Sequence, residues 1–306
     1  MPIEYAIIVK SKTRLETLIE RFNTKAQAKF YIESLGANYQ EYELEHNTFY
    51  RALETLQLKL TKLIKNKIIE RSFLPSFLFD EKHVIIVIGQ DGLVANTAKY
   101  AKNCPIIAVN PDPSRFDGPL LPFNVNNFTE AVTKTLQTKH TSRKVHFAQA
   151  TLNDGQRLLA FNDLFIGAAT HVSARYKIQF NSGNEVHSSS GIIVSTSVGN
   201  TGWMSSIFNM AQGIAQLSSA SASFVQPTLN DNQLIFAVRE PFLSKTTSAS
   251  INCGLIQENN QLVLESMMPT NGVIFSDGIE SDFIRFNSGA IATIGLAKEK
   301  VNLVVN

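Results

Sequence analysis

The chain has 306 residues, a formal net charge of +2 and a pI of about 8.4. Hydrophobic residues make up 44% and charged residues 18% of it, so its composition excludes a disordered chain and supports a large core. The near-neutral charge excludes a general nucleic-acid binder, and the absence of any run of about 18 consecutive apolar residues excludes a helical membrane span.

The cysteine content predicts a reducing compartment. The sequence holds two cysteines, Cys104 and Cys253, which are too few for a disulfide framework or a four-cysteine zinc site. We therefore expect two buried free thiols. The first residues lack the basic and apolar regions of a secretory signal. The expected protein is cytoplasmic, with no membrane partner.

The first half of the chain alternates between strand and helix patterns. Buried strands are predicted at 5–9, 84–88 and 105–109, and helices around 53–63 and over 95–102. This order is typical of a doubly wound α/β domain with a largely parallel sheet. Ligands of such sheets bind at the carboxyl ends of the strands, where the turns after Ile88 and Val109 lie.

The second half, after about residue 143, is mostly β. Short runs with β alternation predict strands at 158–166, 176–180, 192–195, 234–238, 262–264 and 290–295. One helix is expected over 203–214, and the serine-rich stretch 218–223 is expected to form a loop. The sequence thus predicts two domains, an α/β domain followed by a β-rich one.

Two loops at strand ends of the first half could bind phosphate. Gly89-Gln90-Asp91-Gly92 joins a strand to a helix, where glycines and backbone N–H groups favour an anion and Asp91 could act as a general base. The alternative is an ordinary turn with Asp91 as helix N-cap. The loop 110–118 begins at Asn110, and its Arg115 could bind phosphate or could be a solvated surface arginine.

Three segments of the second half are candidates for binding or turns. Asn162-Asp163 interrupts an apolar run; it could read an adenine edge and ribose hydroxyls, or be a bulge or turn. The loop 195–202 could wrap a polar ligand next to the flat face of Trp203, or cap a helix with Trp203 in the core. Ser276-Asp277-Gly278 favours a hairpin turn.

The order of these segments resembles the NAD kinase family, most closely its mitochondrial-type branch, nearly end to end. The matching segments are Ile7-Ile8-Val9-Lys10 with Thr13-Arg14-Leu15-Glu16; Gly89-Gln90-Asp91-Gly92 for G-G-D-G; Asn110-Pro111-Asp112-Pro113 with Asp117-Gly118 and Leu121-Pro122; Asn162-Asp163; Ser189-Ser190-Gly191 with Thr196-Ser197-Val198-Gly199 and Trp203; Val238-Arg239-Glu240-Pro241; and Asp277-Gly278.

The resemblance implies a two-domain fold. Residues 1–143, with a C-terminal return of about 282–306, would form the α/β nucleotide-binding domain, and residues 144–281 the β-rich NAD-binding domain. It also implies homodimers or higher homo-oligomers.

The resemblance further implies transfer of a phosphoryl group from ATP, or another phosphate donor, to the 2′-hydroxyl of the adenosine ribose of NAD, with Mg²⁺ bridging the phosphates. Asp91 would be the general base. The implied ligand-binding residues are Gly89, Gln90, Gly92, Asn110, Arg115, Asn162, Asp163, Thr196, Gly199, Thr201 and Trp203.

Departures from the family pattern leave two alternatives open. Gln90 replaces a glycine, and if that position needs a positive φ the change costs about 1–2 kcal/mol. Leu93 replaces a threonine, and Gly202 replaces a threonine or alanine before the aromatic residue. The chain could therefore be a kinase of the same fold with a sugar or lipid acceptor, or a non-catalytic NAD- or nucleotide-binding homologue.

Overall fold

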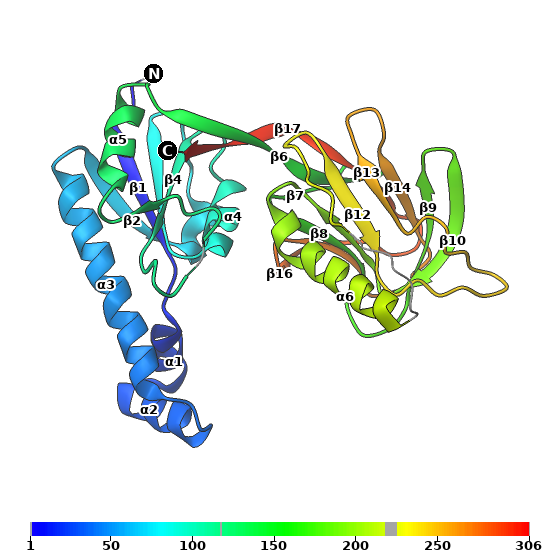
Figure 1. Ribbon diagram of the computed structural model, residues 1–306, viewed down its shortest axis with the longest axis horizontal. Coiled ribbons are helices and arrows are strands. Elements are labelled where there is room, and N and C mark those ends of the chain that lie inside the picture. The colour runs from blue at the N-terminus through cyan, green and yellow to red at the C-terminus, as the bar shows by residue number, and fades with distance from the viewer. Residues whose placement is uncertain (1, 117, 218–224, 306) are drawn as a thin grey trace. The chain divides into compact units, whose positions relative to one another are not determined.

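The computed structural model describes residues 2–116, 118–217 and 225–305, and of Ser281 only the backbone. The chain forms two compact units, one of residues 1–143 with 301–306 and one of residues 144–300 (Figure 1). The part of the C-terminal segment grouped with the first unit thus begins at Val301, later than the expected 282. The serine-rich stretch 218–223, expected to be a loop, lies outside the described residues.

The first unit is built on a parallel sheet. Its main strands, in the order β4-β3-β1-β2, are β1 (Tyr5–Lys10), β2 (Lys65–Glu70), β3 (His83–Ile88) and β4 (Pro105–Asn110). Two further segments pair with β4 in parallel, β5 (Phe123–Asn124) and the end of β17 (Ile291–Val305). The β-branched runs of β1 and β3 are buried on both faces, as a parallel sheet covered by helices requires.

Helices α3 and α5 cover one face of this sheet. The helical elements of the unit are α1 (Arg14–Phe22), α2 (Lys25–Ser34), α3 (Tyr39–Thr61), the 3₁₀ helix η1 (Arg71–Ser76), α4 (Asp91–Ala98) and α5 (Phe128–Leu136). Leu53, Leu56 and Leu60 are buried against the sheet, which confirms the predicted leucine face. Leu63 lies beyond the end of α3 and is exposed.

Helix α4 does not lie where the sequence predicted it. The expected range of 95–102 is wrong, because the helix begins at Asp91 and ends at Ala98. The turn at Gly89 leads directly into the helix, and every residue from Leu93 to Ala98 is buried. Asp91 consequently occupies the first helical position.

The second unit is mostly β, as the sequence predicted, and its strands form two antiparallel sheets. One comprises β6 (Thr141–Leu152), β7 (Arg157–Ala160), β9 (Ala174–Phe180), β10 (Gly183–Ser189), β14 (Leu262–Ser266) and the first part of β17. The other, in the order β13-β12-β11-β8-β15-β16, comprises β8 (Asp163–Ala168), β11 (Ile192–Ser195), β12 (Leu234–Val238), β13 (Cys253–Ile256), β15 (Gly272–Ser276) and β16 (Ile279–Arg285).

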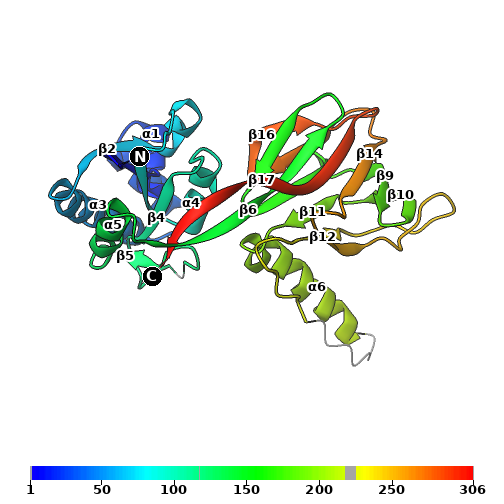
Figure 2. The ribbon, with the colours of Figure 1, turned by 90° about the horizontal axis from the view of Figure 1, so that it is seen from above.

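Buried residues from both sheets form the core of the second unit, and helix α6 (Trp203–Leu217) packs on the outer face of the second sheet (Figure 2). The predicted strand 158–166 is two strands, β7 and β8, separated by a turn at Phe161 and Asn162. Cys104 is buried as expected, whereas Cys253 is exposed. Cys253 lies on the edge strand β13, where the expectation of a buried thiol is wrong.

Candidate functional site

The turn after β3 depends on a glycine at position 89. Gly89 is buried, and a Cβ atom added to it would lie 2.9 Å from Cδ2 of Leu93. The missing side chain therefore lets the first turn of α4 approach the end of the strand. Leu93 stands where the family has threonine, and its side chain is buried against this glycine. The leucine therefore adds to the packing of the turn.

The other two positions of the turn lie open. Gln90 is exposed and is the N-cap of α4 with φ −96° and ψ 166°, a conformation that any residue adopts. The strain considered for Gln90 is therefore absent. Gly92 is exposed, and nothing lies within 4 Å of a Cβ added to it. The N–H groups of the first helical turn favour an anion at this open side.

Asp91 lies in this turn as a half-buried carboxylate. It is the first residue of α4 rather than its N-cap, which overturns the capping alternative. Its Oδ1 accepts a hydrogen bond from the N–H of Leu120 at 3.3 Å. Burial raises the pKa of Asp91, and the hydrogen bond from Leu120 opposes that effect. A carboxylate with a raised pKa is a better proton acceptor for a hydroxyl group.

Asn110 and Arg115, in the loop after β4, have partners within the protein. The Asn110 side chain donates from Nδ2 to the carbonyl of Phe116 at 2.9 Å and accepts from the N–H of Asp112 at 2.9 Å. Arg115 pairs with Glu45 at 3.1 Å. The structure thus uses Asn110 to fix the loop and Arg115 to tie it to α3. Asp117, the acidic residue of this loop in the family pattern, lies outside the described residues.

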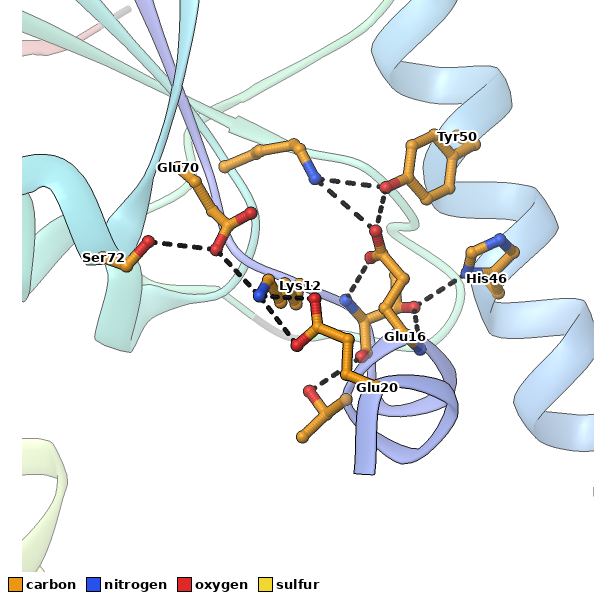
Figure 3. Close-up of polar contacts among 10 residues, drawn as sticks. Lys12, Glu16, Glu20, His46, Tyr50, Glu70 and Ser72 are labelled. Atoms are coloured by element: carbon orange, nitrogen blue, oxygen red, sulfur yellow. Dashed lines mark hydrogen bonds and ion pairs between the residues drawn. The ribbon is translucent and has the colours of Figure 1, made fainter. Parts of the chain in front are cut away.

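A charged network lies at the carboxyl end of β1, next to the Gly89 turn (Figure 3). Lys10 ends β1 opposite Ile88 of β3, and its Nζ lies 3.1 Å from the hydroxyl of Tyr50 and 3.7 Å from Glu16. Tyr50 in turn donates a hydrogen bond to Glu16. Lys12 pairs with carboxylates of α1 and β2. These contacts fasten α1 and α3 to the edge of the sheet at which Asp91 lies.

In the second unit the structure brings Asn162, Asp163, Thr196 and Gly199 together. The N–H of Thr196 donates to the carbonyl of Asn162 at 2.9 Å, and its hydroxyl donates to the carbonyl of Phe161 at 2.6 Å. The same hydroxyl accepts from the N–H groups of Val198 and Gly199 at 3.2 Å. One threonine side chain therefore joins the 161–163 turn to the loop after β11.

Gly199 allows the closest approach between these two segments. A Cβ atom at this position would lie 2.3 Å from the carbonyl oxygen of Asn162 and 2.7 Å from Oγ of Ser195. Those distances are far shorter than a non-bonded contact, so a larger residue would push the loop away from Asn162.

Asp163 carries an unpaired buried oxygen. It begins β8 opposite Ser195 of β11, and its Oδ1 is buried without a hydrogen-bond partner. Burial raises the pKa of Asp163 to about 7, against a hydrogen bond with Ser195, and the nearby carboxylate of Asp277 adds to the rise. An unpaired polar atom of this kind is costly and is a frequent property of binding sites.

Trp203 lies at the start of α6 beside a cavity of about 550 Å³. Its ring is parallel to that of Phe165, with centroids 6.0 Å apart, and the guanidinium of Arg239 lies 5.6 Å from its centroid. Phe165, Phe275 and Arg239 also line the cavity. None of the three was a predicted site residue, and the contact of Phe165 with Phe275 follows only from the register of β8 and β15. Thr201 is exposed, and its hydroxyl donates to the carbonyl of Val198 at 3.4 Å.

Two further features are absent from the described part of the chain. No group of three or more His, Cys, Asp or Glu residues that could hold a metal lies among residues 2–116, 118–217 and 225–305. In the same ranges, no helix is long and apolar enough to cross a membrane.

No protein-family model matches the chain, and no curated protein matches it by sequence. Many solved structures match it, and two of them do so over nearly its full length. An NAD kinase from Archaeoglobus fulgidus in complex with ATP has a TM-score of 0.56 at 14% identity, covering 99% of this chain and 94% of its own. Yeast NADH kinase complexed with NADH has a TM-score of 0.58 at 13% identity, covering 100% of this chain and 84% of its own.

The chain has the NAD kinase fold. This confirms the fold predicted from the sequence, an α/β domain with a largely parallel sheet followed by a mostly β domain. At 13–14% identity the likeness is one of fold, and the mitochondrial-type branch remains a prediction.

Proposed function

We propose that the chain is an NAD kinase-like phosphotransferase. It would move a phosphoryl group from ATP, or from another donor such as polyphosphate, to the 2′-hydroxyl of the adenosine ribose of NAD and so form NADP. The observation that carries the proposal is Asp91, a half-buried carboxylate in an open glycine turn at the carboxyl edge of a parallel sheet. The fold shared with an ATP-bound and an NADH-bound kinase supports it.

In this proposal the Gly89–Gly92 turn binds the donor phosphates through backbone N–H groups, with Gly92 leaving room for them. Asp91 accepts the proton of the acceptor hydroxyl. At the same time the oxygen of that hydroxyl forms a bond to phosphorus, and the phosphate–oxygen bond of the donor breaks. Positioning and charge stabilisation then account for most of the catalysis. Mg²⁺ would be held mainly by phosphate oxygens, a mode that needs only one or two carboxylates from the protein.

The second unit would bind the acceptor. The Asn162 amide suits an adenine edge, and the Asp163 carboxyl suits ribose hydroxyls. Thr196 and Gly199 would shape this site through their contacts with the 161–163 turn, and Thr201 and Trp203 would line it. Because Asn110 and Arg115 are already paired, we assign them to shaping the sheet edge in the first unit rather than to direct phosphate contact.

The conformation of Gln90 weighs against the non-catalytic alternative. That alternative rested on Gln90 and Leu93 in the phosphate turn, and the extended backbone of Gln90 removes the strain considered for that residue. A kinase with a sugar or lipid acceptor keeps the same phosphate side and differs only in what the second unit binds. We further propose a cytoplasmic homodimer or higher homo-oligomer.

The test is direct detection of NADP after incubation with NAD, ATP and Mg²⁺, for the wild type and Asp91→Asn. We expect the substitution to lower turnover by about 10²–10⁴-fold, the usual contribution of a general base. Glu81→Gln, which changes an exposed carboxylate before β3, is the control and should be neutral. Binding of NAD without turnover would point to a non-catalytic homologue, and no binding would point to another acceptor.

A further inference from the structure

The hairpin turn between β15 and β16 has an unusual partner. Asp277 and Gly278 are its central residues, with φ of 55° and 69°. Positive φ at both positions defines a type I′ turn, for which Asp-Gly and Asn-Gly are the preferred pairs. This confirms the predicted hairpin. The turn itself, however, needs nothing further from the Asp277 carboxylate.

That carboxylate instead binds a distant part of the second unit. Its Oδ1 accepts from the N–H of Asn162 at 2.6 Å and from that of Asp163 at 3.3 Å, and its Oδ2 accepts from the N–H of Phe161 at 3.1 Å. The N–H of Asp277 also donates to the carbonyl of Asp163 at 2.9 Å. Three successive N–H groups thus surround one anion, an arrangement that proteins use to bind anions tightly.

The 161–163 turn is therefore held from two sides. Asp277 takes its N–H groups, and Thr196 takes the carbonyls of Phe161 and Asn162. Since the backbone groups of the turn are occupied by these two residues, the Asn162 and Asp163 side chains remain as its means of meeting a ligand. Asp163 is the residue with the unpaired buried oxygen.

We infer that Asp277 is a positioning residue, whose carboxylate fixes the 161–163 turn so that Asn162 and Asp163 are presented to the bound nucleotide. The identity of that ligand rests on the proposed function; the fixing of the turn does not.

A second Asp-Gly turn in the same unit provides a matched comparison. Asp154 and Gly155 join β6 to β7, and Asp154 is exposed. Its carboxylate accepts from the N–H of Gln156 at 3.0 Å and from the Gln156 side chain at 2.6 Å, both within the same turn. An aspartate that serves only its own turn bonds in this local way, whereas Asp277 bonds to residues 114–116 positions away.

The test compares Asp277→Asn with Asp154→Asn in the full chain. Asparagine keeps the type I′ turn but places an amide where a carboxylate accepted three N–H groups. We expect amide hydrogen exchange at Phe161 and Asn162 to accelerate by about tenfold or more in Asp277→Asn, the effect of losing hydrogen bonds to a charged group. Asp154→Asn should leave those amides unchanged.

Unchanged exchange at 161–162 in Asp277→Asn, or equal acceleration in Asp154→Asn, would overturn the inference. If Asp277→Asn fails to fold, Asp277→Ser replaces it. Serine removes the carboxylate acceptor and does not place the N–H donors of an amide against the three backbone N–H groups. The same local acceleration is then expected, and its absence contradicts the positioning role.

Steady-state kinetics gives the functional readout. With the turn loosened, KM for NAD should rise by about fivefold or more while kcat changes by less than about threefold, since binding is weakened more than chemistry. A fall in kcat alone would contradict the assignment. If the wild type forms no NADP, the proposed function fails, while the exchange experiment still decides whether Asp277 fixes the turn.

Discussion

At the residue scale, Asp163 should give the protein a pH-dependent stability. Burial raises its pKa to about 7 in the folded chain, from an ordinary value of 3.8. The folded state therefore holds a proton that the unfolded state has released between these values, and stability falls as the pH rises from about 4 to about 7. Above pH 7 the contribution is constant.

Asp163→Asn removes this titration. The difference in unfolding free energy between variant and wild type should shift in favour of the variant from pH 4 to pH 7 and then stay level. Urea unfolding at pH 4.5, 6 and 8 measures it. A difference that is independent of pH would show that Asp163 is ionised throughout, and Glu258→Gln, an exposed carboxylate of the same unit, provides the baseline.

Gln90 gives a second prediction at this scale. Restoring the family's glycine with Gln90→Gly should leave the rate of NADP formation within about threefold, because the residue already has φ −96° and no strain is relieved. The measurement is kcat/KM for ATP in both proteins. A gain of about tenfold or more would show that the glutamine side chain obstructs the phosphates.

At the scale of elements, two glycines in the first turns of helical segments should respond in opposite ways to replacement by alanine. Gly199→Ala forces a Cβ to within 2.3 Å of the Asn162 carbonyl, so we expect it to lower the unfolding free energy by about 1–3 kcal/mol. Gly92→Ala meets nothing within 4 Å and lies in α4, so it should raise stability by up to about 1 kcal/mol.

Denaturant unfolding of the two alanine variants checks both signs. Gly92→Ala should nevertheless raise KM for ATP, because the methyl group fills the open side of the turn where phosphate is proposed to bind. A stable variant with unchanged KM would remove Gly92 from the phosphate site.

Strands with a short apolar run bounded by turn residues could be predicted from the sequence, whereas more polar strands such as β2 and β10 could not. β11 and β12 were predicted with the bounds that the structure has, Ile192–Ser195 and Leu234–Val238. The start of α4 could not be predicted, because the residues before Leu93 have the composition of a turn although the helix begins at Asp91. Apolar periodicity gives no sign of a helix whose first turn is Asp-Gly.

Contacts between distant segments of the site also escaped prediction. Asn162 and Asp277 were each singled out in the sequence, yet their hydrogen bond depends on β15 pairing with β8 in a particular register. The pairing of Asp163 with Ser195 depends in the same way on β8 and β11. A single sequence gives the faces of strands but not which strands are neighbours.

At the scale of the whole molecule, the first unit depends on residues from the far end of the described chain. Val304 is 2% exposed and belongs to the core that α3 and α5 form with the parallel sheet. Val304→Ala should therefore destabilise the first unit by about 1–3 kcal/mol. Ile291→Ala, at an exposed position of the same strand, should cost less than about 1 kcal/mol.

Hydrogen exchange measured by mass spectrometry shows which of the two units is destabilised. For Val304→Ala the faster exchange should be confined to residues 1–143 and 301–306, the unit in which Val304 is buried. Equal acceleration over residues 144–300 would show that the two units unfold together.

The return of β17 to the first unit also sets an order of events during synthesis. Asn302 and Leu303 pair with Pro105 and Ile106 of β4, but they leave the ribosome after all of residues 144–300. The edge of β4 in the first unit is therefore unpaired while the second unit is translated. Unpaired strand edges can form hydrogen bonds with other chains and so cause aggregation. The nascent chain should thus be most prone to aggregation in the interval between translation of residue 143 and residue 301.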